Sequence, residues 1–265
     1  LIVHALVGYV ELGTDSWISK ITGSIMASPA NGLLLFVYTS ALMFVLRFFA
    51  GPIVERISPL GLLAVSALLG ALGLTLLGNA EGGLMCVVAA TVYGIGKTFL
   101  WPTMLAVVSE QFPKGGAITI GATGAAGMLS AGLLGGPGIG FFQDQAASQN
   151  LRQADAGVYE RYKSDKEGEF LWLKAVGLNG QKVGVLEDGG KEASRALDIM
   201  KNDKGTKEHL LHDQEKLVDW WNSSAAPHAA ADKTLVEAAG LFGGRQALKL
   251  TAMIPATMLL CYLAL

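Results

Sequence analysis

Charged residues are concentrated in one part of this chain. Of its 42 charged residues, 31 lie between Gln143 and Arg245, and the other 162 positions hold only 11. Ionisable side chains are rare in segments that cross a lipid bilayer, so this division predicts two different environments. We expect residues 1–142 and 245–265 to lie within a membrane, and residues 143–244 to form a soluble insert.

Six apolar segments are long enough to cross a bilayer as helices, which requires about 20 mostly apolar residues. They run from Leu1 to Ile21, Leu33 to Ala50, Leu60 to Leu77, Leu84 to Val108, Ala117 to Phe142 and Ala247 to Leu265. In lipid the backbone polar groups must be bonded internally, and a helix achieves this. The sequence therefore predicts an all-α membrane protein, a six-transmembrane-helix bundle with a mostly helical soluble insert before the last helix.

Composition argues against several classes of function. The formal net charge is −2 and the pI is near 6.1, so we expect no nucleic-acid partner. The apolar segments make the lipid bilayer the expected partner. Cys86 and Cys261 both lie in apolar runs, which leaves no disulfide framework or zinc site. The apolar segments hold no G-x-S-x-G or H-E-x-x-H motif. We therefore expect no enzyme and no cofactor.

The short links between apolar segments predict an orientation. Arg47, Arg56 and Lys114 lie in the links after the second and fourth segments, whereas the opposite links hold Lys20 as their only basic residue. Because basic residues favour the cytoplasmic side, the links with three basic residues are predicted to be cytoplasmic. The insert is then extracytoplasmic, and long loops largely escape this charge rule.

Within the insert, helical spacing of apolar residues recurs over Ala193–Met200 and Lys207–Trp221, and Gln181–Leu186 is predicted to form a short strand. His209 and His212 share a helix face, but no convincing third ligand accompanies them, so we expect no metal site.

Three ionisable residues lie near the middle of the bilayer in the predicted membrane helices, where each costs at least about 2.5–3.5 kcal/mol. They are Glu11, Asp15 and Lys97. Helical spacing places Thr14 beside the two carboxylates, and places Tyr93 and Trp101 on the face of Lys97. These residues form a candidate site for binding a solute and coupling its movement to an ion. The alternative is that Glu11 or Asp15 pairs with Lys97 only to neutralise a structural charge, and a pair that breaks on binding would satisfy both interpretations.

The segment Gly51-Pro52-Ile53-Val54-Glu55-Arg56 has the form G-x-x-x-[D/E]-R between two apolar segments. It resembles the signature loop of the major facilitator superfamily, where the acidic residue caps a neighbouring helix and pairs with an arginine. The resemblance implies a cytoplasmic gate formed by Arg47, Gly51, Glu55 and Arg56. A plain polar turn with Gly and Pro as helix breakers is the alternative.

A second segment, Gly94 to Thr103, resembles the tenth helix of sugar and organic-solute symporters of the same superfamily, where a Pro-Thr pair such as Pro102-Thr103 kinks the helix. That family has two related halves of six helices, and the altered signature loop favours the C-terminal half. Leu1 already lies inside an apolar run, so we expect a fragment whose missing N-terminal half belongs to the same chain. The insert lies outside the resemblance.

Together these observations predict a secondary active transporter that moves a small polar solute, such as a sugar or metabolite, by alternating access. The expected coupling ion is a proton, with sodium as the alternative. The expected location is a bacterial inner membrane, which the chain crosses several times. The competing hypothesis is a membrane-anchored receptor-like or structural protein that acts through its soluble insert.

Overall fold

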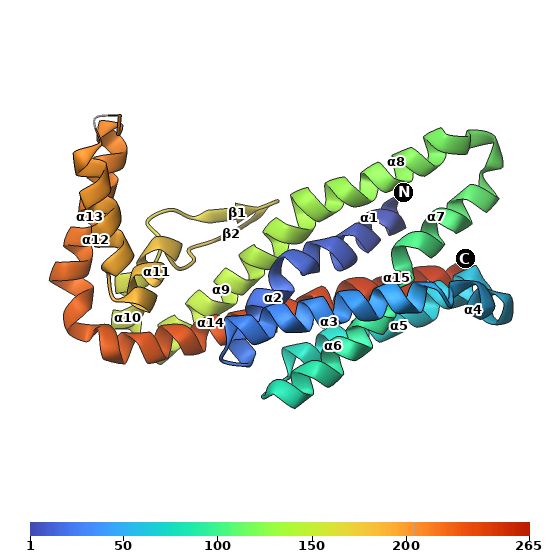
Figure 1. Ribbon diagram of the computed structural model, residues 1–265, viewed down its shortest axis with the longest axis horizontal. Coiled ribbons are helices and arrows are strands. Elements are labelled where there is room, and N and C mark those ends of the chain that lie inside the picture. The colour runs from blue at the N-terminus through green and yellow to red at the C-terminus, as the bar shows by residue number, and fades with distance from the viewer. Residues whose placement is uncertain (204) are drawn as a thin grey trace. The chain divides into compact units, whose positions relative to one another are not determined.

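The computed structural model describes residues 1–203 and 205–265 and consists almost entirely of helices (Figure 1). The chain divides into two compact units. The first comprises residues 1–143 and 244–265, and the second comprises residues 144–243. Two long helices, α9 (Gly136–Ala154) and α14 (Ala229–Thr251), run through the two boundaries between these units.

The first unit contains the apolar segments, and each of them is helical. Its elements are α1 (Ile2–Gly8), the π-helical turn η1 (Tyr9–Gly13), α2 (Thr14–Ile25), α3 (Pro29–Arg47), α4 (Ala50–Ile57), α5 (Pro59–Gly78), α6 (Gly83–Lys97), α7 (Leu100–Gln111), the 3₁₀ turn η2 (Pro113–Gly115), α8 (Gly116–Ser130), the π-helical turn η3 (Ala131–Gly135), the start of α9, the end of α14, and α15 (Met253–Ala264).

Serine and proline set the start of two long helices. The Ser28 hydroxyl accepts from the Asn31 N–H before α3, and the Ser58 hydroxyl accepts from the Gly61 N–H before α5. In both cases a proline occupies the first helical position. The N–H at this position has no partner within the helix, and the fixed φ of proline is compatible with helical geometry. The segment between these helices is itself helical, because Gly51 to Arg56 lie within α4 rather than in an irregular turn.

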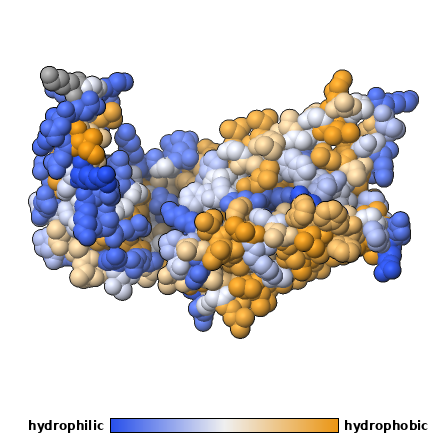
Figure 2. All heavy atoms as spheres, viewed as in Figure 1, coloured by the Kyte–Doolittle hydropathy of each residue, from blue (hydrophilic) through white to orange (hydrophobic). Residues whose placement is uncertain are grey.

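Within residues 1–203 and 205–265, five helical segments are long and apolar enough to cross a membrane. The segment formed by α1, η1 and α2 is not among them, because His4, Glu11 and Asp15 lower its mean hydropathy. Many large apolar side chains of the first unit face outward, including Leu33, Leu84 and Leu133. Figure 2 shows such side chains gathered over α3, α5 and α6. A contiguous apolar surface of this kind is typical of a membrane protein.

Two π-helical turns face each other in the first unit, since η1 packs against η3. Gly13 of η1 lies so close to Gly135 of η3 that a Cβ added to Gly13 would lie 2.7 Å from the Gly135 Cα. Small residues allow helix backbones to approach closely in lipid. The glycines therefore hold the first helical segment directly against the glycine-rich one.

The second unit is a small helical domain with a core of its own. Its elements are the end of α9, α10 (Ala156–Tyr162), β1 (Gly168–Phe170), β2 (Leu173–Ala175), α11 (Gly180–Asp188), α12 (Lys191–Asn202), α13 (Glu208–Trp220), the π turn η4 (Trp221–Ala225), the 3₁₀ turn η5 (Ala226–His228) and the start of α14. Leu151, Tyr162 and Trp221 lie in its buried core. A buried Asp232 accepts two hydrogen bonds from Arg161, at 2.6 and 2.8 Å.

The prediction of a strand over Gln181–Leu186 is wrong, because these residues lie within α11. The Asn179 side chain caps this helix and accepts from the N–H groups of Gln181 and Lys182. Such a cap satisfies backbone donors that a strand would have to pair elsewhere. The strands of the second unit are β1 and β2, which form an antiparallel hairpin.

Candidate functional site

The Glu11 carboxylate lies in the π-helical turn η1 and is 4% exposed. One of its oxygens accepts from the Arg47 guanidinium at 3.1 Å, and the other accepts from the Trp101 backbone N–H at 3.2 Å. Three separate helical segments therefore converge on one buried carboxylate. π-helical turns inside longer helices occur frequently at functional sites.

The Glu11 carboxylate contacts the helical segment formed by α6 and α7, which is interrupted near its middle. The predicted helix over Leu84–Val108 is divided into α6, which ends at Lys97, and α7, which begins at Leu100. Pro102 has no N–H, so it cannot donate to the Thr98 carbonyl four residues earlier. The Arg47 Nε supplies that hydrogen bond at 3.2 Å.

Glu11 and Arg47 thus satisfy the backbone on both sides of the break. Trp101 is the second residue of α7, so its N–H has no acceptor within that helix, and Glu11 accepts from it. The anion stands at the start of α7 and the cation at the end of α6, which is the arrangement that the helix dipoles favour. The two side chains also pair with each other.

A second ion pair joins Asp15 of α2 to Lys97 at the end of α6. Lys97 is 1% exposed, whereas the Asp15 side chain is 25% exposed. The Lys97 ammonium also lies 5.3 Å from the centroid of the Tyr93 ring, within the range of a cation–π contact. The sequence left open whether Glu11 or Asp15 pairs with Lys97. In the structure Lys97 pairs with Asp15.

Tyr93 and Thr14 join α6 to the first helical segment beside the ion pairs. The Tyr93 hydroxyl donates to the Val10 carbonyl of η1 at 2.6 Å, and the Thr14 hydroxyl contacts both the Tyr93 hydroxyl and the Val10 carbonyl. Tyr93 is fully buried and Thr14 nearly so. Both hydroxyls therefore hold α6 against the first helical segment in this conformation. That they also contact a solute stays a prediction.

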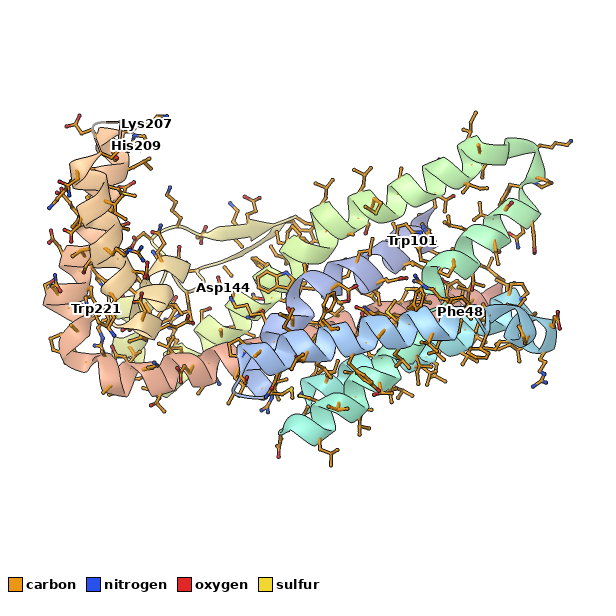
Figure 3. The ribbon with its side chains drawn as sticks, viewed as in Figure 1. Phe48, Trp101, Asp144, Lys207, His209 and Trp221 are labelled. Carbon is orange, nitrogen blue, oxygen red and sulfur yellow. The ribbon has the colours of Figure 1, made fainter. Side chains whose placement is uncertain are left out.

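Trp101 is half-buried, and its ring lies between α1 and α7 (Figure 3). It packs edge-on against His4, with ring centroids 4.5 Å apart, and lies close to Gly127 of α8. His4 is fully buried, and its two ring nitrogens form no hydrogen bond with the described residues. Sequence reasoning gave His4 no role, although a histidine inside an apolar segment was the available signal.

The structure does not gather the four predicted gate residues. Arg47 is the last residue of α3, and its guanidinium is directed to Glu11 and Thr98. Gly51, Glu55 and Arg56 are exposed on α4, and neither charged residue forms an ion pair within residues 1–203 and 205–265. The expectation that Arg47 joins Glu55 is corrected accordingly: Arg47 pairs with the buried Glu11 carboxylate.

The network contains two acids and two bases, so its formal charge is balanced. Its members are Glu11, Asp15, Arg47 and Lys97. Removing one partner of a buried pair is costly because it leaves the other charge unpaired. The fold and the site together define a helical membrane protein with a neutral ion-pair network at a broken helix. Comparisons with known protein families, with curated proteins and with solved structures find no match for this chain.

Proposed function

We propose that this chain is the C-terminal half of a secondary active transporter of the major facilitator superfamily type, which moves a small polar solute by alternating access. The observation that carries the proposal is the Glu11–Arg47 pair across the break between α6 and α7. Broken helices whose ends bind charged groups are typical of solute and ion sites in transporters.

The geometry supports an ion-coupled exchange of partners. Glu11 and Asp15 each hold a base from a different helix. A proton or sodium ion on either carboxylate weakens its attraction for Arg47 or Lys97 and frees that base for another partner. Coupling requires only that the solute binds with different affinity to the two charge states. A proton-coupled symporter is the proposed form.

The aromatic and hydroxyl groups beside the network are the proposed solute ligands. Trp101 offers a half-buried ring at the start of α7, and Thr14 and Tyr93 offer hydroxyls that already exchange hydrogen bonds. Pro102 provides the bend at which α7 can tilt relative to α6, because its ring removes one backbone hydrogen bond. The proposed cytoplasmic gate consists of Gly51, Glu55 and Arg56 on α4, without Arg47.

The test is solute uptake by the full-length protein across a pH gradient, with Glu11→Gln and Asp15→Asn made separately. We expect each variant to equilibrate solute but to lose accumulation driven by the gradient. The matched control is Glu110→Gln, because Glu110 is an exposed carboxylate at the far end of α7 and its loss leaves accumulation unchanged. Accumulation that persists in both Glu11→Gln and Asp15→Asn would exclude these residues as proton carriers.

The separate core of the second unit favours one further candidate, a receptor-like or structural protein that acts through residues 144–243. Uptake by a variant in which a short linker replaces residues 156–228 separates the two hypotheses. The transporter hypothesis expects the variant to retain uptake. Membrane insertion of the variant is checked first, so that a loss of uptake is assigned to the missing unit and not to misfolding.

A further inference from the structure

The hairpin of the second unit ends in two adjacent exposed apolar side chains. Phe170 pairs with Leu173 across β1 and β2, so Leu171 and Trp172 form the two-residue turn. Leu171 has φ +56°, a region that residues other than glycine rarely adopt. The side chains of Leu171 and Trp172 are 52% and 80% exposed. The turn thus presents a tryptophan and a leucine together at the end of a narrow ribbon.

The chain just after this hairpin is bonded to Asp144, which lies close in sequence to the end of an apolar helical segment. The Leu178 N–H donates to the Asp144 carboxylate at 2.8 Å, and Gly177 packs directly against the same carboxylate. Asp144 lies two residues after the end of the segment Ala117–Phe142, which is the fifth of the predicted membrane segments. Chain connectivity and this bond therefore link the hairpin to a residue only two positions beyond the apolar segment.

The length of the hairpin allows its turn to reach a membrane surface that lies near Asp144. Figure 1 shows the tip of β1 and β2 directed away from α10, α12 and α13, and Asp144 lies near the base of the hairpin in Figure 3. At about 3.3 Å per extended residue, Trp172 lies at most about 20 Å along the chain from Leu178. The polar layer on each side of a bilayer is about 5–8 Å deep, so the turn can reach it.

We propose that Leu171 and Trp172 anchor the second unit to the lipid headgroup layer of the membrane that holds the first unit. Tryptophan is enriched at this depth because its ring is apolar and its N–H needs a polar partner. Glu169 and Lys174, which pair across the two strands behind the turn, are exposed and charged and remain in water. The proposal rests on the membrane-spanning segments and not on transport.

The test places a nitroxide label at the turn of the full-length protein in phosphatidylcholine vesicles. Cys86→Ala and Cys261→Ala remove the native thiols, and Trp172→Cys supplies the labelling site. Ile199→Cys is the matched control, because Ile199 is a 58% exposed apolar residue on α12 of the same unit. Collision rates with oxygen, which partitions into lipid, and with a water-soluble nickel chelate are measured for both labels.

We expect the label at residue 172 to collide more with oxygen and less with nickel than the label at residue 199. Equal collision rates at the two sites would overturn the proposal, and shielding of residue 172 from both reagents would assign the turn to a protein contact instead. A second measurement avoids the label: Trp172→Phe should reduce the fraction of tryptophan emission that brominated phosphatidylcholine quenches. Unchanged quenching would also overturn the proposal.

Discussion

Replacing Glu11 by Ala removes the acceptor that caps the start of α7. The Trp101 N–H, which the carboxylate bonds at 3.2 Å, loses its partner at a cost of about 1–3 kcal/mol. The Arg47 side chain is 45% exposed and can be hydrated, so the loss of its ion pair adds about 1 kcal/mol or less. We expect Glu11→Ala to lower the free energy of unfolding by about 1–4 kcal/mol in total.

A double-mutant cycle with Arg47→Ala separates the ion pair from the backbone caps. Arg47 also donates to the Thr98 carbonyl, a bond that survives in Glu11→Ala. Because Arg47 is half-exposed, we expect a coupling energy of about 0.5–1 kcal/mol between the two substitutions. The assay is thermal unfolding of the purified full-length protein in detergent, with the exposed Glu110→Ala as a control that should stay within about 0.5 kcal/mol of wild type.

Two results would refute this reasoning. If Glu11→Ala unfolds like the Glu110→Ala control, the carboxylate does not stabilise the helix break. If Glu11→Ala is destabilising but the two substitutions add without coupling, Glu11 caps the Trp101 N–H and the Glu11–Arg47 pair contributes nothing measurable. In the second case the exchange of ion-pair partners loses its energetic basis, even though the hydrogen bonds remain as described.

Two further predictions concern packing and pH. Gly13→Ala places a Cβ 2.7 Å from the Gly135 Cα, and we expect it to cost about 1–3 kcal/mol in the same unfolding assay, whereas Gly124→Ala, which meets no atom within 4 Å, should not destabilise. Burial, together with the Asp232 carboxylate, raises the pKa of Tyr162 above its usual 10.0. The neutral phenol therefore stabilises the second unit, and this contribution is lost as the pH rises above 10 and through the folded-state pKa. Protease resistance of the second unit should fall at alkaline pH in wild type and fall less in Tyr162→Phe; equal losses would exclude Tyr162 as the cause.

Hydropathy predicted the long helices of the first unit, because an apolar segment in lipid has few other ways to bond its backbone, but it did not predict the short helix α4. The helical class is confirmed, while only five of the six expected segments are long and apolar enough to span a membrane. The break between Lys97 and Leu100 was suggested by Pro102, whose effect on backbone bonding is local. The π-helical turns η1 and η3 could not be predicted, since they depend on the contact between two helices distant in sequence.

The site was partly predictable for the same reason. Intramembrane charges identified Glu11, Asp15 and Lys97, but the sequence could not show which carboxylate pairs with Lys97. Arg47 was assigned to the gate because it lies beside the segment that resembles the signature loop, where the acidic residue pairs with an arginine. Side chains on a helix lean toward its N-terminus, so the guanidinium of this terminal residue reaches back into the bundle. The error over Gln181–Leu186 had a different cause: the Asn179 cap, a local signal for a helix start, was not used.

The balanced network at the helix break also limits how this protein can change during evolution. Loss of Glu11 alone leaves an excess positive charge and an unsatisfied Trp101 N–H, and loss of Arg47 alone leaves an excess negative charge and an unsatisfied Thr98 carbonyl. Reversing the pair would restore neutrality but would place each charge at the wrong helix end. Viable sequences should therefore replace both residues together with a change at Pro102, which restores an unbroken helix. The three positions are expected to vary as one unit among related chains.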